Sequence, residues 1–413
     1  MRRTLVFVFF NLLLCLLANG SFATVIRVHP TANSIHKAID HAHRGDTLLL
    51  QKGYYKEHDI TVSKKLVIIG VGFPVIDAEG KFQVFMIKGD SVTIKGLQIQ
   101  NIGEASLTDM AGIKIINAKN VVIAGNRLIN NTFGVYIQNS THCEIIDNII
   151  NCHVKDELNG GNGIHAWKSG QLLVKGNAIS GHRDGIYFEF VTNSNIVGNT
   201  SHNNVRYGLH FMFSHNNTYT KNTFKDNGAG VAVMYSKGVT MTDNYFLHNW
   251  GDASYGLLLK EISDSKIEHN YFIKNTTGLY METTTNVAVQ QNVFQENGWA
   301  MRIQASCSGG SFTKNNFIGN SFDVTTNGTM VMNTFNNNYW DKYDGYDLDK
   351  NNVGDVPYYP VSVYSVVTEK IPSAMILYLS LLTDIMDQVE KVMPTVVPDK
   401  LKDNHPMMRK IKL

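Results

Sequence analysis

The chain contains the stretch Asn-Thr-Ser-His-Asn-Asn-Val-Arg-Tyr-Gly-Leu-His-Phe-Met at 199–212, and Asn-Thr-Phe-Lys-Asp-Asn-Gly-Ala-Gly-Val-Ala-Val-Met at 222–234 follows it as a second copy. Each copy opens with an asparagine and closes with a glycine followed by alternating residues. An asparagine with an apolar residue two positions later recurs about every 22 residues, at Asn126, Asn148, Asn177, Asn199, Asn222, Asn244, Asn270, Asn292, Asn315 and Asn333. The glycine recurs in phase, at Gly112, Gly134, Gly163, Gly185, Gly208, Gly230, Gly256 and Gly278. A period of this size with β-type segments is typical of a solenoid, so we predict an all-β, right-handed parallel β-helix.

The alternation after each glycine divides the repeat into an inner and an outer face. The first and third residues after the glycine are apolar in the copies, as in Ile186 and Phe188 or Leu209 and Phe211. We expect them to fill the core, while the second and fourth residues face outward. We expect the asparagines to stack at the corners, where each amide can bond to the asparagines of neighbouring coils.

The two ends of the chain differ from the repeats. Residues 1–23 combine Arg2 and Arg3 with an apolar run and the small-x-small stretch Ser21-Phe22-Ala23, which is typical of a cleaved signal peptide. A helix predicted at 373–393 is too polar and too short for a membrane span, and we interpret it either as a cap or as a docking element for a membrane partner. The predicted organisation is a signal peptide at 1–23, an N-terminal cap with a short helix at 24–60, the β-helix at 61–345, an Asp-rich loop and linker at 346–371, and a C-terminal helix and tail at 372–413.

The charge and the cysteines limit the classes of function. Residues 1–23 contain two Arg and no acidic residue, so the remaining 35 Lys and Arg balance the 35 Asp and Glu. A neutral mature chain gives no indication of a nucleic-acid surface. The mature chain keeps Cys143, Cys152 and Cys307, and this odd number leaves at least one thiol outside an internal disulfide. A bridge between Cys143 and Cys152 is the one pairing that we consider.

The outward face of the glycine segment carries the side chains best suited to chemistry. Neighbouring coils bring the second and fourth residues after each glycine within side-chain reach. Imidazole and thioether groups on this face are soft donors that suit Cu(I) better than calcium or magnesium. Two insertions, near 155–161 and 251–255, lengthen coils at the adjacent corner, and such insertions often mark the binding side. We expect a metal-binding set to converge there from His182, His210, Met212, Met234 and Glu189, with His165 nearby.

Each of these histidines, taken alone, is more simply interpreted as a solvated surface residue. The face as a whole is harder to explain in that way, because an exposed strip rich in aromatic side chains usually binds a partner. The candidates for partner binding on this strip are Trp167, Tyr187, Arg206 and Tyr207.

Two other classes of function remain as alternatives. Aromatic strips on β-helices also suit glycans, but a glycan-cleaving enzyme needs paired acids at catalytic spacing. The acids near the strip form no obvious pair; they are Asp156, Glu157, Asp184 and Glu189. A pure scaffold that binds proteins and no metal is the other alternative, against which the exposed thioethers argue, since they serve no purpose in solubility.

Two further groups of polar residues lie outside the strip. Asp347, Asp349, Asn351 and Asp355 place oxygen ligands as in the first half of an acidic calcium loop, but Tyr358 stands where the bidentate Glu is expected. A structural calcium and a plain Asx-rich turn are the two alternatives there. The histidines of the N-terminal cap are interpreted as surface residues; they are His36, His41, His43 and His58.

Several stretches between residues 181 and 349 are specific rather than repetitive. They include Gly-His-Arg-Asp-Gly-Ile-Tyr-Phe-Glu (181–189), Arg-Tyr-Gly-Leu-His-Phe-Met-Phe-Ser-His-Asn (206–216), Asp-Asn-Gly-Ala-Gly-Val-Ala-Val-Met-Tyr-Ser (226–236) and Asn-Tyr-Trp-Asp-Lys-Tyr-Asp-Gly-Tyr-Asp-Leu-Asp (338–349). In these stretches the chain resembles the NosD family, the periplasmic copper-maturation proteins of nitrous oxide reductase. The resemblance extends from about residue 25 to the tail.

The resemblance implies a secreted β-helix without catalytic turnover that works with an ABC-type transporter, made of a membrane permease and a cytoplasmic ATPase. It implies that copper is received from a small copper chaperone and passed to nitrous oxide reductase in the periplasm. It also implies that the C-terminal helix docks on the permease, and the candidate contacts are Met375, Ile376, Leu377 and Leu379. That the His/Met face binds the metal is our own inference from its outward placement. We therefore expect a scaffold that holds Cu(I) transiently, with few ligands and partial exposure.

Overall fold

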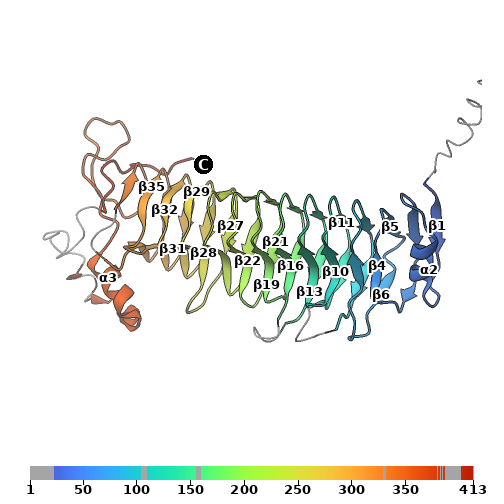
Figure 1. The fold of residues 1–413 in the computed structure, drawn as a ribbon. Helices are drawn as coiled ribbons and strands as arrows, with labels where there is room; N and C mark the ends of the chain where they lie inside the picture. The colour runs from blue at the N-terminus through green and yellow to red at the C-terminus, as the bar shows by residue number, and fades with distance from the viewer. Residues whose placement is uncertain are drawn as a thin grey trace, which may run out of the picture.

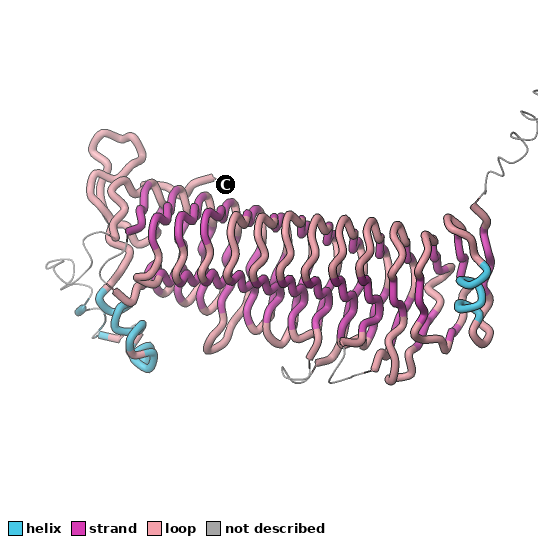
Figure 2. The backbone as a smooth tube through the Cα atoms, in the orientation of Figure 1, coloured by secondary structure: helices cyan, strands magenta, loops and turns pink. Residues whose placement is uncertain are grey.

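The computed structural model describes residues 23–412, apart from 104–108, 155–159, 329–331, 379, 382, 384 and 387–400. The chain forms a long rod of stacked coils with a short helix at each end (Figures 1 and 2). Three parallel sheets run along the rod, and each coil adds one strand to each sheet in turn. The predicted parallel β-helix is therefore confirmed. Nearly all of the predicted signal peptide, residues 1–22, lies outside the described residues.

Sheet 1 is the first side of the coil. Its 14 strands are β1 (Val25–Val28), β2 (Thr47–Leu50), β5 (Val67–Gly70), β8 (Thr93–Lys95), β11 (Val122–Ala124), β14 (Glu144–Ile146), β17 (Leu173–Lys175), β20 (Asn195–Val197), β23 (Thr218–Thr220), β26 (Thr240–Thr242), β29 (Ser263–Glu268), β32 (Thr285–Gln290), β35 (Ser308–Thr313) and β38 (Met332–Asn336).

Sheet 2 is the second side, which follows the asparagine corner. Its 13 strands are β3 (Tyr54–Tyr55), β6 (Val75–Asp77), β9 (Gln98–Gln100), β12 (Arg127–Ile129), β15 (Ile149–Asn151), β18 (Ala178–Ser180), β21 (Thr200–His202), β24 (Thr223–Lys225), β27 (Tyr245–Leu247), β30 (Tyr271–Ile273), β33 (Val293–Gln295), β36 (Asn316–Ile318) and β39 (Tyr339–Trp340).

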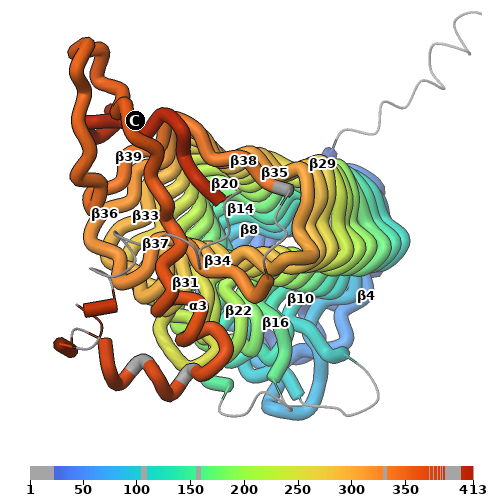
Figure 3. The backbone as a smooth tube through the Cα atoms, turned by 90° about the vertical axis from the view of Figure 1, so that its left-hand side faces the viewer, coloured from blue at the N-terminus to red at the C-terminus, as the bar shows by residue number. Residues whose placement is uncertain are grey.

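Sheet 3 contains the glycine strands and the candidate site. Its 12 strands are β4 (Ile60–Val62), β7 (Phe85–Ile87), β10 (Ala111–Ile116), β13 (Phe133–Gln138), β16 (Asn162–Trp167), β19 (Asp184–Glu189), β22 (Tyr207–Met212), β25 (Ala229–Met234), β28 (Tyr255–Lys260), β31 (Thr277–Glu282), β34 (Trp299–Ile303) and β37 (Phe322–Thr325). Figure 3 looks along the rod, with the coils stacked behind one another around a common core.

The core is filled by ladders of identical or similar side chains. The first and third residues after each glycine point inward as predicted. Ile186, Phe188, Leu209 and Phe211 are fully buried. The aromatic ladder behind sheet 2 runs through Phe224, Phe246, Phe272, Phe294, Phe317 and Trp340, with ring centroids 4.0–5.7 Å apart. This spacing follows from the distance between neighbouring parallel strands, about 4.8 Å.

The asparagines form a continuous hydrogen-bonded ladder inside one corner. In each coil the Oδ1 atom accepts from the backbone N–H and the Nδ2 of the preceding asparagine, as Asn244 does from Asn222 at 3.0 Å each. The last asparagine of this ladder is Asn338, whose Oδ1 accepts from the backbone of Asn315. Our assignment of Asn333 to this ladder is wrong, because Asn333 instead accepts from the backbone of Gly310 at a different corner.

We expect Asn222→Ala to lower the free energy of unfolding by about 3 kcal/mol, because each buried polar group left unpaired costs about 1–3 kcal/mol. The change removes the Oδ1 atom that accepts from the backbone N–H and the Nδ2 of Asn199. It also removes the Nδ2 that donates to the carbonyl of Ile196. Denaturant unfolding measures the loss, and Thr200→Ala, an exposed change on β21, is the control. Equal midpoints for the two variants would contradict a structural role for the ladder.

The helix α2 (Ser34–His41) covers the first coil and buries Ile35, Ala38 and Ile39. The N-cap residue Asn33 makes no side-chain cap bond, and the acceptor at the start of the helix is instead Glu57, from the first coil. Its buried carboxylate accepts from the backbone of Ile35 at 3.0 Å. The cap therefore ties the helix to the solenoid rather than only closing its own first turn.

The C-terminal end differs from the single helix predicted at 373–393. The structure has a helix α3 (Val363–Lys370) followed by a 3₁₀ helix η1 (Pro372–Leu377), and residues 387–400 are outside the described part. Pro372 explains the break, because the residue before a proline is driven out of the helical region, and Ile371 has φ −130° and ψ 84°. No helix within the described residues has the length and apolar character needed to cross a membrane.

The tail returns to the rod and closes its last coil. Residues 401–412 lie along the end of the solenoid, and Asp403 bridges to Phe335 of β38. Ile411 exchanges two hydrogen bonds of 2.9 Å with the side chain of Asn316. On sheet 3, α3 is anchored by Glu369, which accepts two bonds of 2.9 Å from Arg302. Both segments cover edges that a solenoid must not leave open.

Candidate functional site

Two rows of side chains run along the outer face of sheet 3. The strands pair in register, so the second and fourth residues after each glycine stack on their counterparts in the next coil. The second residues after the glycines form the row that we call the inner row, namely Tyr136, His165, Tyr187, His210, Ala232, Leu258, Tyr280 and Arg302. The outer row is Gln138, Trp167, Glu189, Met212, Met234, Lys260 and Glu282.

The inner row is more closely packed than an outer face usually is. Ring centroids lie 4.6 Å apart for Tyr136 and His165, 4.9 Å for His165 and Tyr187, and 5.0 Å for Tyr187 and His210. Burial lowers the pKa of His165 to about 3 and raises the pKa of Tyr136 and of Tyr187 to about 12. These three rings are therefore uncharged at neutral pH. Tyr187 lies between His165 and His210, so the two imidazoles are not neighbours.

A buried ion pair lies beside His210. Asp184 is fully buried at the start of β19 and accepts from Arg206 Nε at 2.9 Å and from Arg206 Nη2 at 2.5 Å. Burial alone would raise the pKa of Asp184, but the bonds from Arg206 and the adjacent His210 outweigh it and keep the pKa below its usual range. His210 Nδ1 is 3.8 Å from Asp184 Oδ2. Arg206, predicted to bind a partner, thus has a structural task as well.

The expected outward placement of His182 is wrong, because this residue is fully buried. It occupies a rung of a second asparagine ladder that continues through Asn204, Asn227, Asn249, Asn275, Asn297 and Asn320. The His182 ring reaches back across the preceding coil to the carbonyl of Thr132, with Nδ1 3.3 Å from the oxygen. Burial lowers the pKa of His182 to about 4, so the ring is neutral. An imidazole is long enough to span this gap, which an asparagine is not.

His210, Met212 and Met234 lie on the same outer face of sheet 3. His210 and Met212 are two residues apart on the outer face of β22, and Met212 is in register with Met234 of β25 and with Glu189 of β19. Tyr187 donates its hydroxyl to the Met212 sulfur at 3.6 Å. His210 is only 5% exposed, and neither of its ring nitrogens has a hydrogen-bond partner among the described residues. An unpaired buried polar group is costly and indicates a missing ligand or water.

The outer edge of the site carries aromatic residues that our reading of the sequence missed. Phe190, Phe213 and Tyr235 directly follow Glu189, Met212 and Met234, and their rings stack at 5.2 and 4.9 Å. All three have φ between 50° and 54°, the left-handed region that bulky residues rarely adopt. Phe190 is 43% exposed and Phe213 is 37% exposed. An aromatic residue at the fifth place after the glycine, in three successive coils, was the signal available in the sequence.

The other predicted partner residues are spread over the rod. Trp167 is half-buried in the outer row, and Tyr207 packs beside His210 with ring centroids 4.8 Å apart. In the C-terminal segment, Ile376 is 88% exposed and Leu377 is 41% exposed. Leu379 and the side chain of Met375 lie outside the described part.

The predicted calcium residues form an Asx-rich turn. Asp347 accepts from the backbone of Asn351 and Asn352, Asp349 accepts from Asn351, and Asp355 accepts from Leu348. These carboxylates thus satisfy backbone N–H groups, which is the alternative to a calcium site. Calcium binding is not supported.

The remaining candidate residues are the cysteines and the acids. Cys143, Cys152 and Cys307 are buried thiols, and Cys143 and Cys152 are not bridged to each other. Asp184, one of the acids considered for glycan cleavage, is committed to Arg206, while Asp156 and Glu157 lie outside the described residues. Within the described ranges, no three His, Cys, Asp or Glu side chains are grouped to hold a metal ion.

The comparisons with known proteins agree with the specific stretches of the sequence. Residues 151–345 match the family model described as "Periplasmic copper-binding protein (NosD)". Two curated proteins named "Probable ABC transporter binding protein NosD" match over most of their length. The one from Pseudomonas aeruginosa is 27% identical over 81% of this chain and 82% of its own, and the one from Stutzerimonas stutzeri is 25% identical over 81% and 80%. Over these residues the chain is similar to the NosD family.

The NosD family match includes sheet 3 from β16 onward, with His210, Met212 and Met234, but neither the N-terminal cap nor α3. Solved structures share the fold alone. The A-module of mannuronan C-5 epimerase AlgE4 from Azotobacter vinelandii has a TM-score of 0.61 at 15% identity, over 74% of this chain and 96% of its own. The catalytic domain of a GH87 α-1,3-glucanase has a TM-score of 0.58 at 13% identity, over 78% of this chain and 70% of its own. The named relatives are binding proteins, whereas these structural neighbours are enzymes, so the fold does not decide between binding and catalysis.

Proposed function

We propose that this chain is a periplasmic copper carrier that holds Cu(I) on His210, Met212 and Met234. The observation that carries the proposal is the buried imidazole of His210, whose two nitrogens lack partners within the described residues and which shares a strand face with the Met212 thioether. Cu(I) satisfies such a nitrogen and accepts thioether sulfur as a further ligand.

The surroundings of these three residues suit a cargo that must leave again. Met212 and Met234 are half-exposed, so a donor or acceptor protein can reach the metal. Glu189 lies in register with Met212 and can supply a carboxylate at the edge of the site. His165 lies on the far side of Tyr187, too distant in the row to bind the same ion as His210. We therefore assign His165 to the strip of side chains that leads to the site, and not to the site itself. Few ligands and an open side favour transfer over storage.

The family description and the names of the relatives support a periplasmic, copper-binding role beside an ABC transporter. We propose that export through a cleaved signal peptide brings the chain to the periplasm, where a copper chaperone loads it and nitrous oxide reductase receives the metal. The exposed apolar side chains of the C-terminal segment, Ile376, Leu381 and Ile385, support docking on the permease of an ABC transporter whose ATPase lies in the cytoplasm. The aromatic column Phe190, Phe213 and Tyr235 borders the metal residues and offers the anchors that protein interfaces favour.

We expect Met212→Leu/Met234→Leu to weaken Cu(I) binding by about 100-fold or more, because leucine keeps the volume of each side chain and removes both sulfurs. Anaerobic competition of residues 24–413 with a chromophoric chelator measures the affinity. Met86→Leu is the matched control, since Met86 lies half-buried on the same face of sheet 3, in β7. His210→Gln tests the imidazole in the same assay.

The proposal requires that the double variant and His210→Gln both lose affinity while Met86→Leu binds as the wild type does. Cu(I) binding that survives in the double variant would move the site away from sheet 3. Loss of affinity in all three variants would mean that the changes act through the fold rather than through the donor atoms. No binding by the wild type would leave a protein scaffold without metal.

A further inference from the structure

The first residue after the predicted signal peptide is held by a buried carboxylate. Thr24 donates its backbone N–H and its hydroxyl to Asp46 Oδ1, at 2.8 Å each. Asp46 is 2% exposed and directly precedes β2, whereas Thr24 directly precedes β1. The carbonyl of Thr24 accepts from the backbone of Thr47 at 2.8 Å, so Thr24 is fixed through both of its peptide groups.

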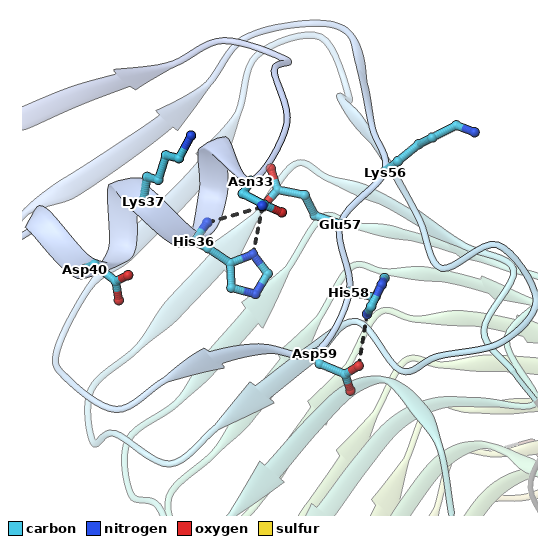
Figure 4. Close-up of a pocket in the computed structure, with 8 residues that line it drawn as sticks. All are labelled: Asn33, His36, Lys37, Asp40, Lys56, Glu57, His58 and Asp59. Atoms are coloured by element: carbon cyan, nitrogen blue, oxygen red, sulfur yellow. Dashed lines mark hydrogen bonds and ion pairs between the residues drawn. The ribbon is translucent and has the colours of Figure 1, made fainter.

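The same carboxylate joins Thr24 to the segment that follows α2. Asp46 Oδ2 accepts from the backbone N–H of His43 at 2.7 Å, just after the end of the helix. Figure 4 shows the start of the helix, at the open pocket between α2 and the loop before β4, where Glu57 accepts from the backbone of His36. Glu57 and Asp46 thus hold the two ends of the helix that covers the first coil.

Cleavage of the signal peptide would place a positive charge at this carboxylate. The stretch Ser21-Phe22-Ala23 predicts hydrolysis of the peptide bond between Ala23 and Thr24. Water is consumed, Ala23 leaves with a carboxylate, and Thr24 keeps the nitrogen as an α-ammonium group with three N–H donors. That nitrogen is the atom 2.8 Å from Asp46 Oδ1. A hydrogen bond between two charged groups is roughly twice as strong as one between neutral groups.

Asp46 lacks the cationic partner that a buried carboxylate usually has. Within the part of the chain that the structure describes, the one basic side chain at ion-pair distance is that of His43, with Nδ1 3.9 Å from Oδ2. The His43 side chain is 82% exposed, so it does not shield the carboxylate from other partners. The hydrogen bonds from Thr24 and His43 keep the pKa of Asp46 below its usual range, so the group is ionised at neutral pH.

We propose that Asp46 binds the mature N-terminus: removal of the signal peptide turns the Thr24 nitrogen into an ammonium group that pairs with Asp46 and locks β1 and the segment after α2 onto the first coil. The cap of the rod is then complete only in the processed chain, which matters because a solenoid depends on its closed ends. The inference rests on the proposed export through a cleaved signal peptide. It does not involve the proposed copper site.

The test measures the pKa of the α-amine in residues 24–413, from the pH dependence of its acylation by labelled acetic anhydride, followed by peptide mass spectrometry. An unperturbed α-amine has a pKa of about 7.7–8.0. We expect a pKa at least about one unit higher in the wild type than in Asp46→Asn, which keeps an oxygen to accept the N–H and loses the charge. The matched control is Asp40→Asn, an exposed acid of the same cap that is shown in Figure 4. The stability that the pair contributes is present below about pH 8 and is lost as the pH rises through the raised pKa.

The same α-amine pKa in the wild type and in Asp46→Asn would overturn the pairing, and so would an equal loss in Asp40→Asn. A thermal scan checks that Asp46→Asn is folded. If it is not, the wild type decides alone, because an α-amine that titrates in its ordinary range has no anionic partner. The intact mass of the exported full-length chain tests the other half of the proposal. A first residue other than Thr24 would overturn the cleavage position, whatever the titration of residues 24–413 shows.

Discussion

Asp184→Ala is expected to lower the free energy of unfolding by about 3–5 kcal/mol, because removing one partner of a buried ion pair leaves the other charge uncompensated. In this chain the residue left behind is Arg206, whose Nε and Nη2 both bind Asp184 and whose side chain is 29% exposed. The backbone of Tyr207 loses an acceptor as well. Denaturant unfolding measures the effect.

A double-mutant cycle with Arg206→Leu separates the pair from the packing around it. We expect Asp184→Ala/Arg206→Leu to be more stable than the sum of the single changes predicts, since the double variant contains no unpaired charge. Additive losses would mean that the two side chains act independently and that the pair is not what stabilises β19 against β22. Cu(I) affinity in the same variants reports whether Asp184 also positions His210, whose Nδ1 lies beside its carboxylate.

Asp403→Ala is expected to open the C-terminal end of the rod. Asp403 is fully buried and takes the place of the next rung after Asn338, from which its Oδ2 accepts a backbone bond of 2.9 Å and a side-chain bond of 3.0 Å. The same oxygen accepts from Trp340 Nε1, and Oδ1 accepts from the backbone of Asn337 and His405. Alanine leaves these donors without an acceptor, at about 1–3 kcal/mol for each buried group.

Hydrogen exchange is the suitable measurement, because a solenoid loses its end coils before its middle. We expect loss of protection in residues 332–341 and 401–412, with β16 to β25 unchanged. Asp403→Asn is the matched control. It keeps one side-chain carbonyl oxygen, like the asparagines at the other rungs of the ladder, and should lose less protection from hydrogen exchange. Protection that is the same in all three chains would show that the tail does not close the ladder.

The sequence was most informative where the fold repeats. The glycine and asparagine positions predicted the strands, the inward Ile186 and Phe188, and the register of the two rows on sheet 3. In a solenoid each coil contacts its neighbours, so a local period reports directly on three-dimensional contacts. Our assignment failed at the last coil, where Asn338 rather than Asn333 continues the ladder: Asn338 lies 23 residues after Asn315, so the period itself holds there and Asn333 departs from it.

The candidate site was predictable only in part. The sequence placed His210, Met212 and Met234 on one outer face because strand alternation is fixed by the backbone. It could not show that His182 lies inside, since this depends on its contacts with Asn204 and Thr132 of other coils. Nor could it show that Asp184 and Arg206 form a buried pair, or that Phe190 and Phe213 stack at the edge.

The sequence by itself determined the parallel β-helix and its period, and it carried the resemblance to the NosD family, because these depend on repeated and local patterns. Only the tertiary structure decided which polar side chains are free to bind. His182 and His210 have the same chemistry, yet His182 holds a rung of the second asparagine ladder and contacts the carbonyl of Thr132, whereas His210 lies on the outer face of β22 beside Asp184. Likewise His36 and His58, which are 22 residues apart, share a pocket because α2 folds over the first coil. The hydrogen bonds that separate a structural imidazole from an available one come from neighbouring coils, and the spacing of residues along the chain does not contain them.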